Sequence, residues 1–99
     1  MVVLFQLLTD KIRSFGEIEL HAGKFDITVR RNSTFLSVLI EKDHITLFFI
    51  SRKAIDEFPV YQTFRSSANR WVSSVKIESS DEIDSQLMRW LWEAWELAV

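Results

Sequence analysis

The side chains best suited to bind a ligand are basic residues in the middle of the chain, with aromatic residues among them. Guanidinium and ammonium groups bind phosphate oxygens, and aromatic rings stack on nucleic-acid bases. If these residues converge in space, they form a site for an anionic partner such as nucleic acid, and otherwise they form a solvated polar rim. The predicted binding set is Lys24, Arg30, Arg31, Arg65, Arg70 and Trp71.

Charge is distributed unevenly along the chain, although the net charge is only −2. Residues 21–76 carry nine Lys/Arg and five Asp/Glu, a net of +4, whereas residues 77–99 carry one Arg and six acids, a net of −5. We therefore expect a basic face on the middle of the fold and an acidic C-terminal helix.

Catalytic and metal-binding patterns are absent from the sequence. The chain has no cysteine, which excludes thiolate catalysis and Cys-ligated metal sites. Its two histidines, His21 and His44, have no ligand-spaced partners, and two glycines cannot build most phosphate-binding loops. We predict no catalytic residue, no metal and no cofactor, and a binding domain is favoured over an enzyme.

The C-terminal segment predicts an amphipathic helix that opens with a capping box between Ser79 and Glu82. At about 100° per residue, one stripe faces the core; it comprises Ile83, Leu87, Trp90, Ala94 and Leu97. A second apolar surface comprises Met88, Trp92 and Trp95. We predict that this surface packs against an N-terminal helix, a partner subunit or a ligand, because clusters of exposed Trp and Met commonly mark interfaces.

Hydrophobic periodicity predicts a single domain over residues 1–99, of the α+β class. A helix is expected from Val2 to Phe15, followed by about five antiparallel strands and the Trp-rich helix, with both helices packed on the sheet. The strands expected are 17–20, 25–30, 34–42, 45–50 and 71–77, and residues 52–59 are expected to form a loop.

The two central strands are apolar on both faces, which indicates that the sheet needs a second cover. We expect five residues to share one face: Leu36, Val38, Ile40, Phe48 and Ile50. A homodimer that buries this face is the resulting hypothesis. The opening run MVVLFQLL has neither basic flank nor cleavage site, and no uncharged apolar stretch reaches membrane-spanning length. We therefore expect a cytoplasmic protein outside the membrane.

Two parts of the sequence are similar to a bacterial family named domain of unknown function 5655. The first is the run from Arg65 through Trp71 and Ser80 to Ala94, and the second is the Lys24-Phe25 pair followed by Arg30-Arg31 and the strand from Phe35 to Lys42. The resemblance covers nearly the whole chain. It implies a compact domain that occurs alone or joined to other domains, and it implies no particular activity.

The function expected from the sequence is non-catalytic binding of an anionic partner through the basic strand ends. The alternative is a small-molecule-binding domain, acting as a homodimer, with its pocket between the sheet and the Trp-rich helix.

Overall fold

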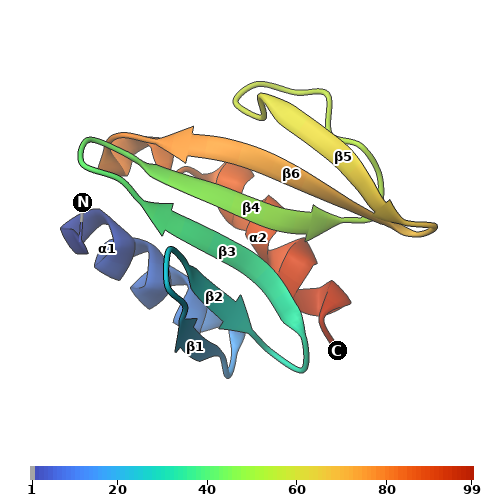
Figure 1. Cartoon of the computed structure of the whole chain (residues 1–99), viewed down its shortest axis with the longest axis horizontal. Coiled ribbons are helices and arrows are strands. Elements are labelled where there is room, and N and C mark those ends of the chain that lie inside the picture. Colours follow the sequence, from blue (N-terminus) through green and yellow to red (C-terminus); the bar gives the residue numbers. More distant parts are fainter. Residues whose placement is uncertain (1) are drawn as a thin grey trace.

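Two helices and a six-stranded sheet make up the computed structural model of the chain, which describes residues 2–99 (Figure 1). The elements follow in the order α1 (Val2–Ile12), a 3₁₀ turn (Arg13–Phe15), β1 (Glu19–Ala22), β2 (Ile27–Arg30), β3 (Thr34–Ile40), β4 (Ile45–Ser51), β5 (Gln62–Ser67), β6 (Arg70–Ile77), a second 3₁₀ turn (Ser80–Glu82) and α2 (Ser85–Leu97).

The strands form one antiparallel sheet in the order β1-β2-β3-β4-β6-β5. Both helices lie on the same face of this sheet, with α1 near β3 and α2 behind β4 and β6 (Figure 1). The predicted α+β class, the N-terminal helix and the C-terminal helix packed on the sheet are confirmed. The sheet has six strands where about five were expected, because β5 was missed.

β5 escaped prediction because it is an exposed edge strand with one large apolar side chain, Phe64. Period-2 alternation is a signal of one buried face, and β5 buries neither face fully. Only its backbone pairing to β6, with Phe64 opposite Val72 and Thr63 opposite Ser73, defines it as a strand.

The core lies between the helices and the covered face of the sheet. α1 contributes Leu8 and Ile12, both fully buried, and α2 contributes Leu87, Leu91 and Ala94. On the sheet side, the registers place one set of apolar residues in facing rows: Leu36 with Phe49, Val38 with Leu47 and Val75, and Ile40 with Ile45 and Ile77.

These registers correct the predicted grouping of Leu36, Val38, Ile40, Phe48 and Ile50. Residues directly opposite each other in an antiparallel pair point to the same face. Leu36, Val38 and Ile40 are opposite Phe49, Leu47 and Ile45, so Phe48 and Ile50 lie on the other face of the sheet. The helices cover one face, and the face that carries Phe48 has no element of residues 2–99 packed across it (Figure 1).

The start of α2 also differs from the prediction. The capping box between Ser79 and Glu82 is present, but it caps the short 3₁₀ turn. The α-helix begins three residues after that turn, at Ser85, where the Asp84 carboxylate accepts a hydrogen bond of 2.9 Å from the Leu87 amide. The buried stripe also differs in part: Ile83, Leu87 and Ala94 are buried as expected, but Leu91 and Ala98 are fully buried, while Trp90 and Leu97 are half-buried.

Candidate anion-binding site

Basic residues gather at one end of the strands, which we call the basic end. It consists of the β2–β3 turn, the C-terminal end of β4 and the β5–β6 turn, which lie on the same side of the sheet, where these strands end or begin (Figure 1). Residues 30–34, 51–53 and 65–70 hold six Lys/Arg and no Asp/Glu. The six are Arg30, Arg31, Arg52, Lys53, Arg65 and Arg70.

The opposite end of the strands, which we call the acidic end, carries the reverse charge. Residues 22–27, 40–44 and 77–84 hold two lysines and seven acids, a net of −5 against +6 at the basic end. The helix α2 starts at the acidic end and finishes at the basic end (Figure 1). Acids near the N-terminus of α2 stabilise its dipole, and so does Arg31 at its C-terminal end, whereas Glu93 and Glu96 in its last turns oppose it.

Four acids border the basic end. Glu19 is directly opposite Arg30 in the sheet register, and Glu17 precedes β1. Glu93 and Glu96 are exposed on the last turns of α2. The positive potential is therefore focused on the turns themselves and falls off towards β1 and α2.

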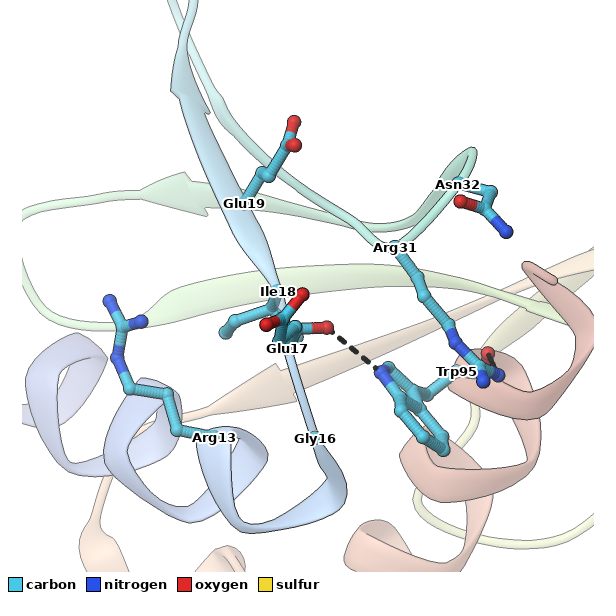
Figure 2. Close-up of a pocket in the computed structure, with 8 residues that line it drawn as sticks. All are labelled: Arg13, Gly16, Glu17, Ile18, Glu19, Arg31, Asn32 and Trp95. Carbon is cyan, nitrogen blue, oxygen red and sulfur yellow. Dashed lines mark hydrogen bonds between the residues drawn. The ribbon is translucent and has the colours of Figure 1, made fainter.

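At the β2–β3 turn, Arg31 is held in place by Trp95 (Figure 2). Its guanidinium carbon lies 3.7 Å from the centre of the Trp95 ring, and its Nη1 donates a hydrogen bond of 3.2 Å to the Trp95 backbone carbonyl. A guanidinium stacked on an indole is stabilised by the ring's negative face. The backbone N–H of the neighbouring Asn32 donates a hydrogen bond to the carbonyl of Ala98, so this turn caps the C-terminal end of α2.

Trp95 also contacts the segment that links α1 to β1. Trp95 Nε1 donates a hydrogen bond of 3.3 Å to the carbonyl of Glu17, and its ring centre lies 6.3 Å from that of Phe15. Gly16 adopts φ = 151°, and a Cβ built on it would lie 2.6 Å from Trp95 Cζ2. Only glycine fits this approach without strain. Trp95 thus joins α1, β1 and the β2–β3 turn to the end of α2.

An open cavity of about 810 Å³ lies around this junction. It is lined by Arg13, Gly16, Glu17, Ile18, Glu19, Arg31, Asn32 and Trp95 (Figure 2). Arg31 keeps donor capacity beyond the one bond to Trp95, because a guanidinium has five N–H groups. Arg13, Arg31 and the side chain of Asn32 can donate hydrogen bonds to an anionic group here. Two carboxylates, those of Glu17 and Glu19, line the same cavity, so the ligand must carry cationic or donor groups as well.

At the β5–β6 turn, both arginines bond backbone carbonyls of their own hairpin. Arg65 donates to the carbonyls of Ser67 and Ala68 at 3.2 and 3.1 Å, and Arg70 donates to that of Asn69 at 3.0 Å. Trp71 is half-buried and lies opposite Arg65 and Ser51 in the register. The two charges remain at an exposed tip while the bonds fix their position.

The predicted binding set therefore divides. Arg30, Arg31, Arg65 and Arg70 share the basic end, together with Trp71. Lys24 does not: it lies in the β1–β2 turn at the acidic end, 5.5 Å above the ring of its neighbour Phe25. The structure therefore does not bring Lys24 together with the other four cations, because the two ends of an antiparallel strand lie on opposite sides of the sheet. Arg52 and Lys53 also belong to the basic middle of the sequence but are not in the predicted set; they follow β4 directly and lie at the basic end.

The predicted interface of Met88, Trp92 and Trp95 also divides. Met88 and Trp95 are half-buried and pack against the core within this chain. Trp92 remains 45% exposed. It borders a groove of about 570 Å³ between α2 and the segment that follows β4, together with Ile55, Trp90 and Leu97 and several charged residues. Trp90 stacks on Phe49 with ring centres 6.0 Å apart, which fixes the floor of the groove.

Each histidine pairs with a nearby carboxylate in an exposed position. His21 Nε2 lies 3.1 Å from Glu19, and His44 Nδ1 lies 2.8 Å from Asp43. The hydrogen bond from His44 is the main cause that lowers the pKa of the Asp43 carboxyl below its usual value. Within residues 2–99, no group of three or more His, Asp or Glu side chains is placed to hold a metal ion.

Comparison with known proteins gives one match. No curated protein and no solved structure matches the chain. Over residues 2–99, none of the helices is both long and apolar enough to cross a membrane. The model of the family described as "Domain of unknown function (DUF5655)" matches residues 1–98, almost the full length of the chain. The chain therefore belongs to the DUF5655 family.

Proposed function

We propose that this domain is a non-catalytic binding module that engages an extended anionic partner, such as nucleic acid, at the basic end of its sheet. The observation that carries the proposal is the separation of charge between the turns: the three segments of the basic end hold six cations and no acid, with Glu17, Glu19, Glu93 and Glu96 at their border, and those of the acidic end hold two cations and seven acids. A random mixture of surface charge would not favour one end for a polyanion.

The spacing of the basic turns favours a polymer over a single phosphate. The β2–β3 turn and the β5–β6 turn are centred three strand positions apart in the sheet, which corresponds to about 14 Å at the usual inter-strand spacing. One phosphate cannot contact both turns, whereas several successive phosphates of a nucleic acid strand can. Both turns belong to the same chain, so this role needs no second copy. A cytoplasmic location stays a prediction.

The test is binding of a fluorescein-labelled single-stranded oligonucleotide, measured by anisotropy at two salt concentrations. If all six cations neutralise phosphates, log K falls with log salt with a slope of about −4. A fourfold increase in salt then weakens binding by about 300-fold. Affinity that does not change with salt would rule the proposal out.

A matched pair of double variants locates the site. Arg52→Ala with Lys53→Ala removes two charges from the basic end, and Lys24→Ala with Lys42→Ala removes two from the acidic end. The first pair should weaken binding and reduce the magnitude of the salt slope by about 1.4. The second should leave both unchanged. Equal losses in the two variants would show that binding follows net charge alone.

A second candidate function is supported by the groove beside Trp92. Its volume of about 570 Å³ is within the range of small-molecule sites, and it combines apolar and charged lining residues. We propose as the alternative that a small amphipathic metabolite binds between α2 and the segment after β4. Quenching of tryptophan emission by members of a metabolite panel, lost in Trp92→Phe, would support it. No response to the panel would eliminate it.

A further inference from the structure

The face of the sheet turned away from the helices carries a contiguous apolar patch. Ile50, Val72 and Phe64 are directly opposite one another on β4, β6 and β5, so their side chains form a row on one face. Phe48 lies two residues before Ile50 and therefore on the same face. Phe64 is 47% exposed, and Phe48, Ile50 and Val72 are half-buried. We call this surface the open face.

We propose that the open face binds the open face of a second copy of this chain, forming a two-fold dimer in which the strands of the two copies run in opposite directions. This inference goes beyond the proposed function and does not depend on it. Two observations favour a second copy as the occupant: the charge at the two ends of the strands, and the size of the face.

The charge separation determines how two copies can meet. A two-fold axis that lies between the sheets and runs across the strands places the basic turns of each copy, with six cations, over the acidic turns of the other, with seven acids and two lysines; Glu17 and Glu19 at the border of the basic end reduce this attraction near β1. An axis parallel to the strands would place like ends together, which is unfavourable. The chain is therefore complementary to itself in one orientation, as an isologous interface requires.

The size of the face is sufficient for a specific dimer. The whole uncovered side of the six-stranded sheet, of which the open face is the apolar part on β4, β6 and β5, measures about 24 by 24 Å, or about 600 Å² per copy. The total of about 1,200 Å² lies at the lower limit of specific interfaces, so we expect a dimer that forms at micromolar concentration.

The same axis predicts which residues meet. An axis across the middle of the strands stacks β6 of one copy on β6 of the other in the opposite direction. Arg70, at the start of β6, then faces Glu78 of the second copy, just after the end of that strand. Phe48, near the middle of β4, lies close to the axis and meets Phe48 of the second copy.

The test is the molar mass in solution, measured by light scattering without nucleic acid over the micromolar range. The wild-type chain should change from monomer to dimer as its concentration rises. Phe64→Asp should weaken association by at least tenfold, because it places two charges in the interface. Phe58→Asp is the matched control, since Phe58 is 91% exposed in the segment before β5 and should leave association unchanged.

A charge exchange keeps the test decisive if Phe64→Asp impairs folding. Arg70→Glu and Glu78→Arg should each weaken the dimer by about tenfold, since each places like charges together twice by symmetry. The double variant should recover to within about threefold of the wild type. A wild-type chain that stays monomeric at the highest concentration, or single variants as tight as the wild type, would overturn the proposal.

Discussion

The contact between Gly16 and Trp95 makes a quantitative prediction about stability. Gly16→Ala should destabilise the fold for two separate reasons. The backbone conformation, φ 151° and ψ −158°, belongs to a region that only glycine occupies readily, and forcing another residue into it costs about 1–3 kcal/mol. The added Cβ would also lie 2.6 Å from Trp95 Cζ2, and such overpacking costs about 1–3 kcal/mol.

The expected total is about 2–6 kcal/mol, a large fraction of the stability of a typical domain of about 5–15 kcal/mol. Urea denaturation followed by far-ultraviolet circular dichroism measures it without depending on tryptophan emission. Gly23→Ala is the matched control. Its Cβ would lie 2.6 Å from Asp26 Oδ1, which can rotate away, and 3.3 Å from the Asp26 carbonyl oxygen, which needs only a small shift, so the cost should stay at about 1 kcal/mol.

A double variant separates the two causes. In a Trp95→Ala background the steric part disappears, and Gly16→Ala should cost only the backbone part of about 1–3 kcal/mol. If Gly16→Ala in the wild-type background changes the free energy of unfolding by less than about 0.5 kcal/mol, the reasoning about this junction is refuted. An unchanged cost in the Trp95→Ala background would refute the steric part alone.

Three further predictions concern α2 and the β3–β4 turn. Asp84→Ala should lower the free energy of unfolding by about 1 kcal/mol, because the Leu87 amide loses its capping acceptor; urea denaturation measures this loss. Leu91→Ala should cost about 2–5 kcal/mol and exceed the cost of Trp92→Ala, although Trp is larger, because Leu91 is fully buried and Trp92 is 45% exposed; equal costs would contradict the burial argument. His44→Ala should raise the pKa of the Asp43 carboxyl, because the hydrogen bond that favours the carboxylate is lost; NMR titration measures this pKa. In the wild type the folded-state pKa of Asp43 is lower than the unfolded-state pKa. The stabilisation from this pair is therefore present above the unfolded-state pKa and is lost as the pH falls through the folded-state pKa.

The elements that bury one strong apolar stripe could be predicted from the sequence. The helices follow from period 3.6 in the apolar residues, β2 and β6 follow from period 2, and β3 and β4 follow from short continuous apolar runs. β5 could not be found, because its stabilisation is backbone pairing to β6 and not side-chain burial. The face of the sheet on which Phe48 lies could not be predicted either. It depends on the register of β3 against β4, and two strands that are apolar on both faces do not define their register by sequence pattern.

The candidate site was predictable in kind but not in arrangement. Clusters of Arg at strand ends could be read directly, whereas their grouping depends on strand direction. Lys24 and Arg30 belong to the same strand pair and lie at opposite ends of it. The stacking of Arg31 on Trp95 joins residues 64 positions apart, and no local pattern signals such a contact.

The most direct test of the charge-separated site is NMR mapping of a ¹⁵N-labelled chain titrated with a single-stranded oligonucleotide. Binding at the basic end predicts chemical-shift changes in residues 30–34 and 65–70 as well as 51–53, with none in the turns at 22–27 and 40–44. Residues 51–53 also line the groove beside Trp92, so the shifts at 30–34 and 65–70 are the ones that distinguish the two sites. Shift changes centred on the acidic end or confined to the groove beside Trp92, or an absence of shifts at low salt, would contradict the proposed function.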